Sequence, residues 1–308
     1  MPVTLSQAIE GYLLDANARR LSQDTITGYT KIFKRFKTYL PADPPIAEIT
    51  HLHATEFLAS LSTLSNKTLH HYHAALSSLW KWAERERLAS ENIIRRIPPP
   101  RPEERAIVPY TKDEIKAMLG ALDKSRPYIR PGKIESVHTI RTAARNRAIL
   151  LVLVDTGMRA SELCTLRIAD VDLKTRTIIV FGKGAKERVI PISPATSQAI
   201  WRYLTERPNE AINHPLFVAA QSGNELNREG LNHLIVGIAK RADVRAANVH
   251  RFRHTFAINY LRNHGDIYTL QRILGHSTLD MVKRYLAIAQ TDVEAAHRQA
   301  SPVANWRL

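Results

Sequence analysis

The sequence predicts a mainly α-helical protein of two domains, with one small antiparallel β-sheet in the second domain. Apolar residues recur at helical spacing through the first hundred residues, without a strand pattern among them. Prolines then interrupt the chain, and two β-prone runs further on flank a glycine-rich turn. A chain of 308 residues is long enough for two domains with separate cores.

The N-terminal domain, residues 1–97, is predicted to hold four helices. Ser22 is a suitable N-cap for the second of them, and the prolines within 41–45 stop it. This second helix carries several basic side chains away from its apolar face. The apolar stripes place the helices at 4–20, 22–40, 54–61 and 66–88.

Residues 98–109 form a predicted linker. Its consecutive prolines exclude a helix and favour extended polyproline geometry. The sequence leaves two interpretations open: a cationic strap that lets two domains close around a partner, or a plain spacer.

The second domain, residues 110–308, opens with a helix whose capping box is Thr111 and Glu114. Residues 123–139 are rich in lysine and arginine and predict an exposed loop. A strongly apolar helix over 143–156 should end at Gly157. Further helices are expected within 213–247 and at the start of the tail, 291–308.

Two β-rich runs, 177–181 and 188–192, predict a hairpin with its tip at 182–187. Lys183 stands between two glycines at this tip. Phosphate-binding glycine loops look similar, but no Gly-Lys-Ser/Thr signature and helix follow, so we exclude a nucleotide-binding P-loop.

Charge indicates the class of partner. Lysine and arginine total 44 against 29 acidic residues, which gives a net charge of +15 and favours a nucleic acid partner. The single cysteine, Cys164, excludes an intrachain disulfide and favours a cytoplasmic protein. The sequence has no apolar stretch long enough to span a bilayer and no pattern of a signal peptide, so neither is expected. The candidates for contacts with DNA are Lys31, Lys34, Arg35, Lys186, Arg188 and Arg251.

A cluster of basic groups and one tyrosine lies near the end of the chain. His250, Arg253 and His254 are spaced to share one helix face. His276 follows Gly275 at the predicted end of the next helix, and Tyr285 lies on a helix over 280–289. Each residue alone usually has a structural role. Their joint spacing, without a central carboxylate, suits an anionic substrate and a tyrosine nucleophile.

Arg159 adds to this set from far upstream. It opens a helix directly after the break at Gly157, where its charge opposes the helix dipole. Stability therefore does not explain it, whereas a phosphate ligand does. Glu162, three residues on, is placed to hold Arg159.

Five motifs in this order resemble those of the tyrosine recombinases, the phage-integrase family, and most closely its two-domain Xer-like branch. The first four motifs begin at Asp155, Gly182, His250 and Leu274, and the fifth is the single residue Tyr285. The resemblance covers nearly the whole chain. It implies an N-terminal four-helix SAM-like core-binding domain and an α-rich catalytic domain with a small antiparallel β-sheet and a C-terminal docking tail.

The resemblance also implies a mechanism and a set of roles. Tyr285 would attack the scissile phosphate, while Arg159 and Arg253 clamp its oxygens. Lys183 would protonate the leaving 5′-oxygen, and His250 would assist proton transfer from tyrosine. His276 would donate a hydrogen bond to the phosphate, and the role of His254 stays open. No metal, nucleotide or other cofactor is implied.

The implied partners are double-stranded DNA with a specific recombination site and three further copies of the chain. Such a homotetramer on two duplexes would exchange strands through a Holliday junction, with an accessory protein or second recombinase as an option. Two alternatives stay open: a nicking-closing topoisomerase of the same chemistry, and a catalytically silent DNA-binding regulator.

Lys183→Ala should slow strand cleavage by about 10² to 10⁴, the usual contribution of a positioned acid. A 5′-bridging sulfur leaves readily without a proton, so this substitution at the scissile bond should restore most of the mutant's rate. Arg159→Ala, which loses phosphate clamping, should stay slow on the same substrate. Equal rescue of both variants, or none for Lys183→Ala, would move the acid role to Lys186.

Overall fold

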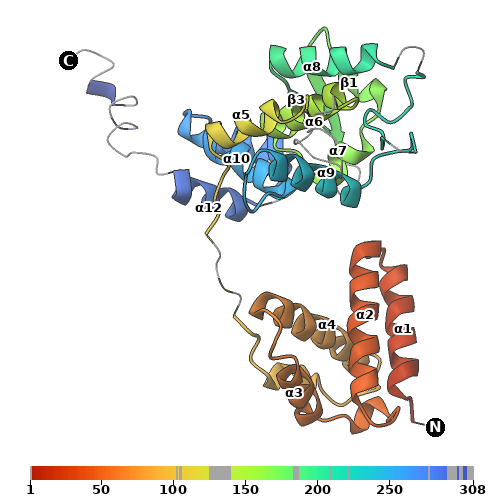
Figure 1. Ribbon diagram of the computed structural model, residues 1–308. Helices are drawn as coiled ribbons and strands as arrows, with labels where there is room; N and C mark the ends of the chain where they lie inside the picture. The colour runs from red at the N-terminus through yellow and green to blue at the C-terminus, as the bar shows by residue number, and fades with distance from the viewer. Residues whose placement is uncertain are drawn as a thin grey trace, which may run out of the picture. The chain divides into compact units, whose positions relative to one another are not determined.

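The computed structural model describes residues 2–101, 103, 106–124, 140–182, 187–207, 210–220, 222–276, 278–289, 297 and 301–303 (Figure 1). The chain divides into two compact units, Met1–Ala106 and Ile107–Leu308. The division lies inside the stretch 98–109 that the sequence marks as a linker. Each unit is described by itself.

The first unit is a helical domain, as predicted. Thr4 caps its first helix through a capping box with Gln7, and the Ser22 hydroxyl accepts a hydrogen bond from the Thr25 amide at the start of the second. Aromatic side chains such as Phe36 and Trp80 fill the core. The four helices are α1 (Leu5–Ala18), α2 (Gln23–Tyr39), α3 (His51–Ser60) and α4 (Asn66–Arg85), with short 3₁₀ turns at Ile46–Glu48 and Ile93–Arg96.

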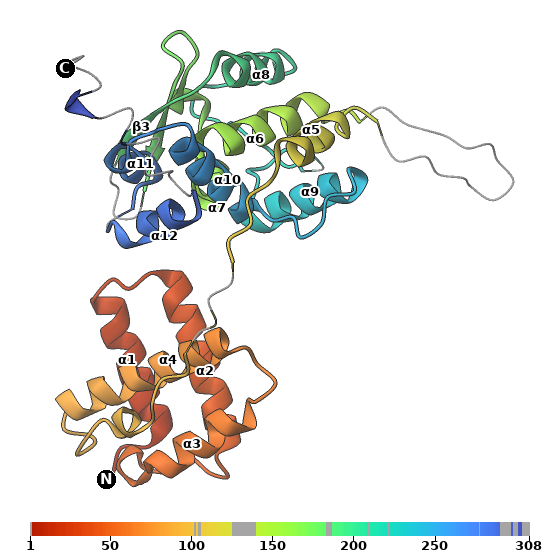
Figure 2. The same cartoon turned by 90° about the vertical axis from the view of Figure 1, so that its left-hand side faces the viewer.

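The second unit is also mainly helical. Helix α6 packs against α8 on one side and α10 on the other, and α12 lies against α10 (Figure 2). The apolar side chains of α6 are buried almost all round, which explains its continuous apolar sequence. The described helices are α5 (Lys112–Gly120), α6 (Ala143–Thr156), α7 (Ala160–Thr165), α8 (Pro194–Thr205), α9 (Arg228–Arg241), α10 (Val249–Arg262), α11 (Ile267–Leu274) and α12 (Asp280–Ala289), with a 3₁₀ turn at Ile168–Asp170.

A small antiparallel sheet completes this unit, in the order β1-β2-β3. The predicted hairpin is formed by β2 (Thr177–Phe181) and β3 (Glu187–Pro191), with Ile178 opposite Ile190. These two side chains and Val180 point into the core. The first strand, β1 (Val171–Asp172), was not predicted, because two residues are too few to show a strand period.

Some predicted features lie outside the described residues. They are the hairpin tip with Lys183 and Lys186, most of the basic loop, and most of the tail. Within 213–247, only α9 is helical, and the described residues before it form turns and isolated bridges.

Two glycines end helices beside the candidate site, both as predicted. Gly157 ends α6 and Gly275 ends α11, each in the left-handed conformation, with φ of 60° and 64°. A Cβ on Gly157 would lie 2.5 Å from a ring carbon of Phe256 on α10. The glycine therefore allows the end of α6 to approach α10 closely, at the position of the candidate site.

Candidate active site

Side chains from four segments of the second unit meet at the ends of α6 and α11. Arg159 comes from the start of α7, and Arg253 with two histidines from α10. His276 follows the end of α11, and Tyr285 comes from the middle of α12. The structure thus brings together five of the six predicted catalytic side chains with His254, and the sixth, Lys183, lies outside the described residues.

Arg253 is the buried centre of the cluster, with 2% of its surface exposed. Its guanidinium donates to the carbonyl oxygen of Gly157 at 2.9 Å and to that of Leu274 at 2.7 Å. These oxygens lie at the C-terminal ends of two helices, where the helix dipoles favour a cation. Burial, and then the nearby charge of Arg159, lower the pKa of Arg253 to about 10, so it stays charged at neutral pH.

Arg159 is the more accessible cation, with its side chain 39% exposed. It donates to Glu162 Oε1 at 2.8 Å and to the carbonyl oxygen of Gly275 at 3.1 Å. Its backbone amide donates to Glu162 Oε2 at 2.8 Å, which closes the start of α7. The contact expected between Glu162 and Arg159 is therefore present.

Glu162 also binds a second arginine, Arg188. Arg188 on β3 donates to both carboxylate oxygens of Glu162, at 3.1 and 2.7 Å, and to the carbonyl oxygen of Ile273 at 2.7 Å. Burial raises the pKa of the Glu162 carboxyl, but the hydrogen bonds from Arg188 and Arg159 outweigh burial and lower it. Arg188 was expected to contact DNA. Its side chain is 13% exposed and joins β3 to α7 and α11, and its contact with DNA stays a prediction.

Arg251 is likewise engaged inside the protein. Its guanidinium lies 4.1 Å from the ring centre of Tyr110 and donates to Glu114 at 2.8 Å, and its side chain is 11% exposed. These contacts give Arg251 a structural role, and its contact with DNA stays a prediction. By contrast, Lys31, Lys34 and Arg35 are exposed on α2.

Tyr285 is buried beside these cations, with 1% of its surface exposed. Its hydroxyl lies 3.0 Å from Nδ1 of His254, and its ring is nearly parallel to that of His276. Burial raises the pKa of the Tyr285 hydroxyl, although the neighbouring charge of Arg253 opposes this. The hydroxyl is therefore protonated in the free protein.

The two half-buried histidines are neutral at ordinary pH. Burial and the nearby charges of Arg253 and Arg159 lower the pKa of His276 to about 4. Burial lowers the pKa of His254 to about 4, with His250 and Arg253 adding to the effect. The exposed His250 stands one turn earlier on α10, its ring edge-on to that of His254 at 4.4 Å.

The contacts of His276 differ from those expected. Its Nε2 lies 2.6 Å from Nη2 of Arg253, and because arginine can only donate, Nε2 accepts. The buried Nδ1 has no hydrogen-bond partner among the described residues. His276 can therefore donate through Nε2 to a phosphate only after the contact with Arg253 is released and its proton moves.

The described residues offer neither a metal site nor a helix that spans a membrane. No group of three or more histidine, cysteine or acidic side chains is placed to hold a metal ion in this part of the chain. No described helix is both long and apolar enough to cross a membrane.

Comparison with known proteins gives one family. Residues 111–292 match the Phage integrase family, and residues 9–87 match the Phage integrase, N-terminal SAM-like domain. Tyrosine recombinase XerC of Bacillus subtilis (strain 168) is 29% identical over 284 residues, covering 88% of each chain. Tyrosine recombinase XerD of Mycobacterium tuberculosis (strain ATCC 25618 / H37Rv) is 27% identical, covering 92% of this chain and 94% of its own. The XerH site-specific recombinase bound to palindromic difH substrate has a similar fold, with a TM-score of 0.72 at 24% identity over 96% of this chain and 84% of that one.

Glu162→Gln should lower the free energy of unfolding at neutral pH by about 3 kcal/mol, because removing one member of a buried ion pair leaves its partners uncompensated. The pKa of Glu162 is lowered in the folded state, so the stabilisation from its charge is complete above the ordinary glutamate value and is lost as the pH falls through the folded one. The gap in melting temperature between the two proteins should hold from pH 7 to about pH 5 and then narrow.

Thermal unfolding between pH 7 and pH 3 measures this gap. Glu229→Gln, at an exposed position in the first turn of α9, is the matched control and should change the free energy of unfolding by less than about 0.5 kcal/mol. A gap that persists unchanged to pH 3 would show that the charge of Glu162 is not what stabilises the fold.

Proposed function

The chain belongs to the phage integrase family and is a site-specific DNA recombinase, and we propose that Tyr285 is the nucleophile with which it cleaves and rejoins strands. One arrangement carries this proposal: a tyrosine hydroxyl enclosed beside a buried arginine and two neutral histidines. The tyrosine oxygen would replace the 5′-oxygen on phosphorus, leaving a 3′-phosphotyrosyl link and a free 5′-hydroxyl. Because the new ester keeps the energy of the old one, rejoining needs no ATP.

Arg159 and Arg253 are suited to hold the scissile phosphate. Both are cations at neutral pH, and both are fixed by carbonyl oxygens at the ends of helices. Fixed donors aimed at developing charge stabilise a transition state without reorganising. No carboxylate among the described residues binds Arg253, so a phosphate would meet little competition there.

The remaining roles follow from the groups around the phosphate. His276 would exchange its contact with Arg253 for one with a phosphate oxygen. Lys183, which follows β2 in the sequence, would protonate the leaving 5′-oxygen. His250, exposed on the outer side of His254, would assist movement of the tyrosine proton.

The buried nucleophile implies a change of conformation during the reaction. A hydroxyl on a side chain that is 1% exposed cannot reach a phosphate in a DNA backbone. Tyr285 would therefore move out of this position, or its cover would open, when DNA binds. Such a step would keep the nucleophile inactive away from its site.

DNA binding would draw on the basic surface of both units. The net charge of +15 suits contacts with many phosphates, and these contacts weaken as salt is added. The exposed side chains of α2 are candidates in the first unit, as expected from the sequence: Lys31, Lys34 and Arg35. A DNA partner would place the protein in the cytoplasm.

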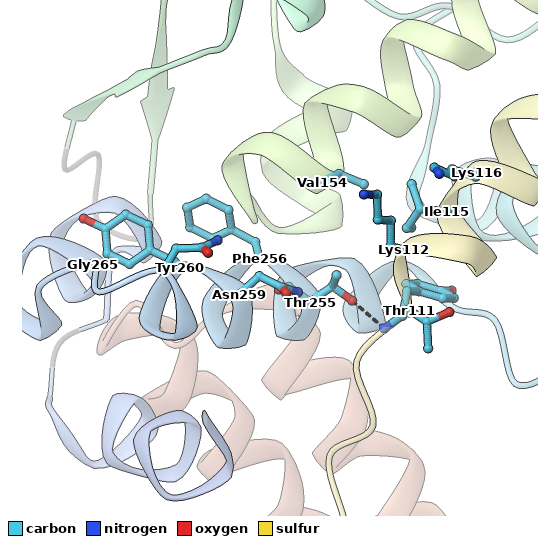
Figure 3. Close-up of a pocket in the computed structure, with 12 residues that line it drawn as sticks. Thr111, Lys112, Ile115, Lys116, Val154, Thr255, Phe256, Asn259, Tyr260 and Gly265 are labelled. Atoms are coloured by element: carbon cyan, nitrogen blue, oxygen red, sulfur yellow. Dashed lines mark hydrogen bonds between the residues drawn. The ribbon is translucent and has the colours of Figure 1, made fainter. Parts of the chain in front are cut away.

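Strand exchange between two duplexes would require four copies of the chain and pass through a Holliday junction. The second unit offers a surface on which such copies could dock: a pocket of about 680 Å³ between α5, α6 and α10. Apolar side chains, including Ile115 and Phe256, line it, and Lys112 and Lys116 stand at its α5 side (Figure 3). We propose that the tail of a neighbouring copy, whose apolar residues include Val303 and Trp306, occupies this pocket.

Tyr285→Phe should keep its affinity for DNA, because one hydroxyl adds little to an interface dominated by phosphate contacts. The variant should form no covalent adduct with DNA. A nicked suicide substrate, which traps the adduct, shows the outcome on a denaturing gel, and a persistent adduct would rule out Tyr285 as the nucleophile. A plasmid with two sites then separates recombination by the wild-type protein from relaxation alone or binding alone.

Truncation after Thr291 should spare binding to a single site but abolish pairing of two sites and strand exchange. Asn259→Trp, which fills the pocket from an exposed position on α10, should weaken assembly by about tenfold or more, a change of 1.4 kcal/mol or greater. Sedimentation of the protein with its site DNA measures both.

Arg262→Trp is the matched control for the pocket variant. It adds the same bulk at an exposed position of α10 that does not line the pocket, and assembly should be unchanged. A truncated protein that still forms an intact tetramer would rule out docking of the tail between copies. The same result is expected if each tail occupies the pocket of its own copy.

A further inference from the structure

We propose that side chains of the two units hold down both ends of the linker, so that only residues 101–106 form the tether between the units. The inference rests on the proposed function, because it assumes that both units bind the same DNA. The linker would then be neither a cationic strap nor a plain spacer. It would be a short tether whose length is set by its anchors.

Two histidines of α4 hold the start of the linker on the first unit. Nε2 of His73 lies 2.8 Å from the carbonyl oxygen of Ile97, and Nδ1 of His70 lies 3.1 Å from that of Pro100. Since a carbonyl oxygen can only accept, each imidazole nitrogen donates. His70 and His73 stand three residues apart on α4, so both face the linker from one side of the helix.

The composition of this stretch leaves its carbonyl oxygens as the groups by which it can be held. Residues 98–100 are prolines, which have no backbone N–H to donate to a neighbouring segment. The two histidines supply donors to the carbonyl oxygens at the two ends of this run. The side chain of Ile97 also packs against the core of the first unit. The proline run is therefore fixed to α4.

An arginine of α10 holds the other end of the linker on the second unit. Arg251 donates through Nε to the carbonyl oxygen of Val108 and through Nη2 to that of Pro109, both at 3.1 Å. One turn further along α10, the hydroxyl oxygen of Thr255 accepts a hydrogen bond from the backbone amide of Tyr110 at 2.7 Å. The end of the linker is thus fixed to the helix that carries part of the candidate active site.

The tether between these anchors is short and has no excess of charge. Before Val108, the side chain of Ile107 already packs against the apolar cluster beside α10. The chain from Pro100 to Ile107 spans about 25 Å at most when fully extended. The two arginines and two glutamates within 101–106 cancel in charge, so attraction along the DNA backbone does not explain this segment.

The length of the tether controls how binding by one unit assists binding by the other. Once one unit is on DNA, the second meets its own contacts at a local concentration that depends on the tether. This concentration falls to near zero when the tether cannot span the two sets of contacts. Release of the histidine contacts would add the three prolines to the tether, about 9 Å in polyproline geometry. The anchors therefore determine how much spare length the two units have on DNA.

The test shortens the tether and then releases one anchor. Deletion of residues 103–105 removes about 10 Å of reach and should weaken DNA binding by about tenfold or more. Adding His70→Ala and His73→Ala to the shortened protein should return the dissociation constant to within about threefold of the wild-type value, because the released prolines replace the lost length. In the protein of full length, the same two substitutions should change it by only about twofold. The probe is a labelled duplex that the wild-type protein selects from a random-sequence pool, and fluorescence anisotropy measures its binding.

Two controls separate tether length from other effects. His71→Ala removes an exposed imidazole from the same helix and should not restore binding to the shortened protein. Insertion of Gly-Ser-Gly at the deletion should restore binding, because only length is required. Unchanged affinity after the deletion, no rescue by the two histidine substitutions, equal rescue by His71→Ala, or no rescue by the insertion would each overturn the proposal.

If the shortened protein does not fold, cutting by trypsin after Arg96 in the protein of full length replaces this comparison. His70→Ala with His73→Ala should raise the rate of this cut by about tenfold or more, because the hydrogen bonds that hold the segment are lost. His71→Ala should not raise it, and an unchanged rate in the paired variant would overturn the proposal. Failure of the proposed function is distinct, because the wild-type protein would then select no duplex and form no covalent adduct.

Discussion

The candidate active site in the second unit depends on a buried cation, Arg253. Moving a guanidinium out of water costs several kcal/mol unless its donors are satisfied. Here the carbonyl oxygens of Gly157 and Leu274 satisfy them, and each lies at the C-terminal end of a helix. Both helices reach this position through left-handed glycines, which let the chain turn away immediately after the carbonyl. The guanidinium is therefore fixed by backbone dipoles, and no carboxylate in the described part of the chain binds it.

The same excess of positive charge explains the behaviour of the neighbouring groups. Glu162 is the carboxylate that the described cluster contains, and it is shared by Arg159 and Arg188. Burial first, and then the remaining charge, lower the pKa of Arg253 and keep His254 and His276 neutral. A site of this kind is complementary to a phosphodiester, because a negative charge relieves the repulsion between cations that are already in place.

The sequence predicts the helices and the identity of the site better than the contacts within it. Helix ends carry local signals, such as the capping box of Thr111 and Glu114 and the glycine after α11, and these predictions are confirmed. Arg188 and Arg251 could not be assigned in this way. Their partners lie 85 and 137 residues away in the chain, and an arginine bound to a distant carbonyl or carboxylate has the same local pattern as a solvated one. His254 presents the same difficulty, because its contact with Tyr285 depends on how α12 packs against α10.

For a site of this kind, the moment at which the tyrosine becomes reactive matters more than how reactive it is. A phosphotyrosyl ester has about the energy of the bond that it replaces, so the cleaved and joined states are similar in free energy. An active nucleophile would then cleave whatever DNA it met. In the free protein the Tyr285 hydroxyl is buried, its pKa is raised, and the histidine beside it is a weak base. Burial accounts for the first two conditions and, together with the charges of His250 and Arg253, for the third, and an arriving phosphate would offset the charge of Arg253. Substrate binding would thus position the phosphate and make the histidine beside the tyrosine more basic, through one electrostatic change at Arg253.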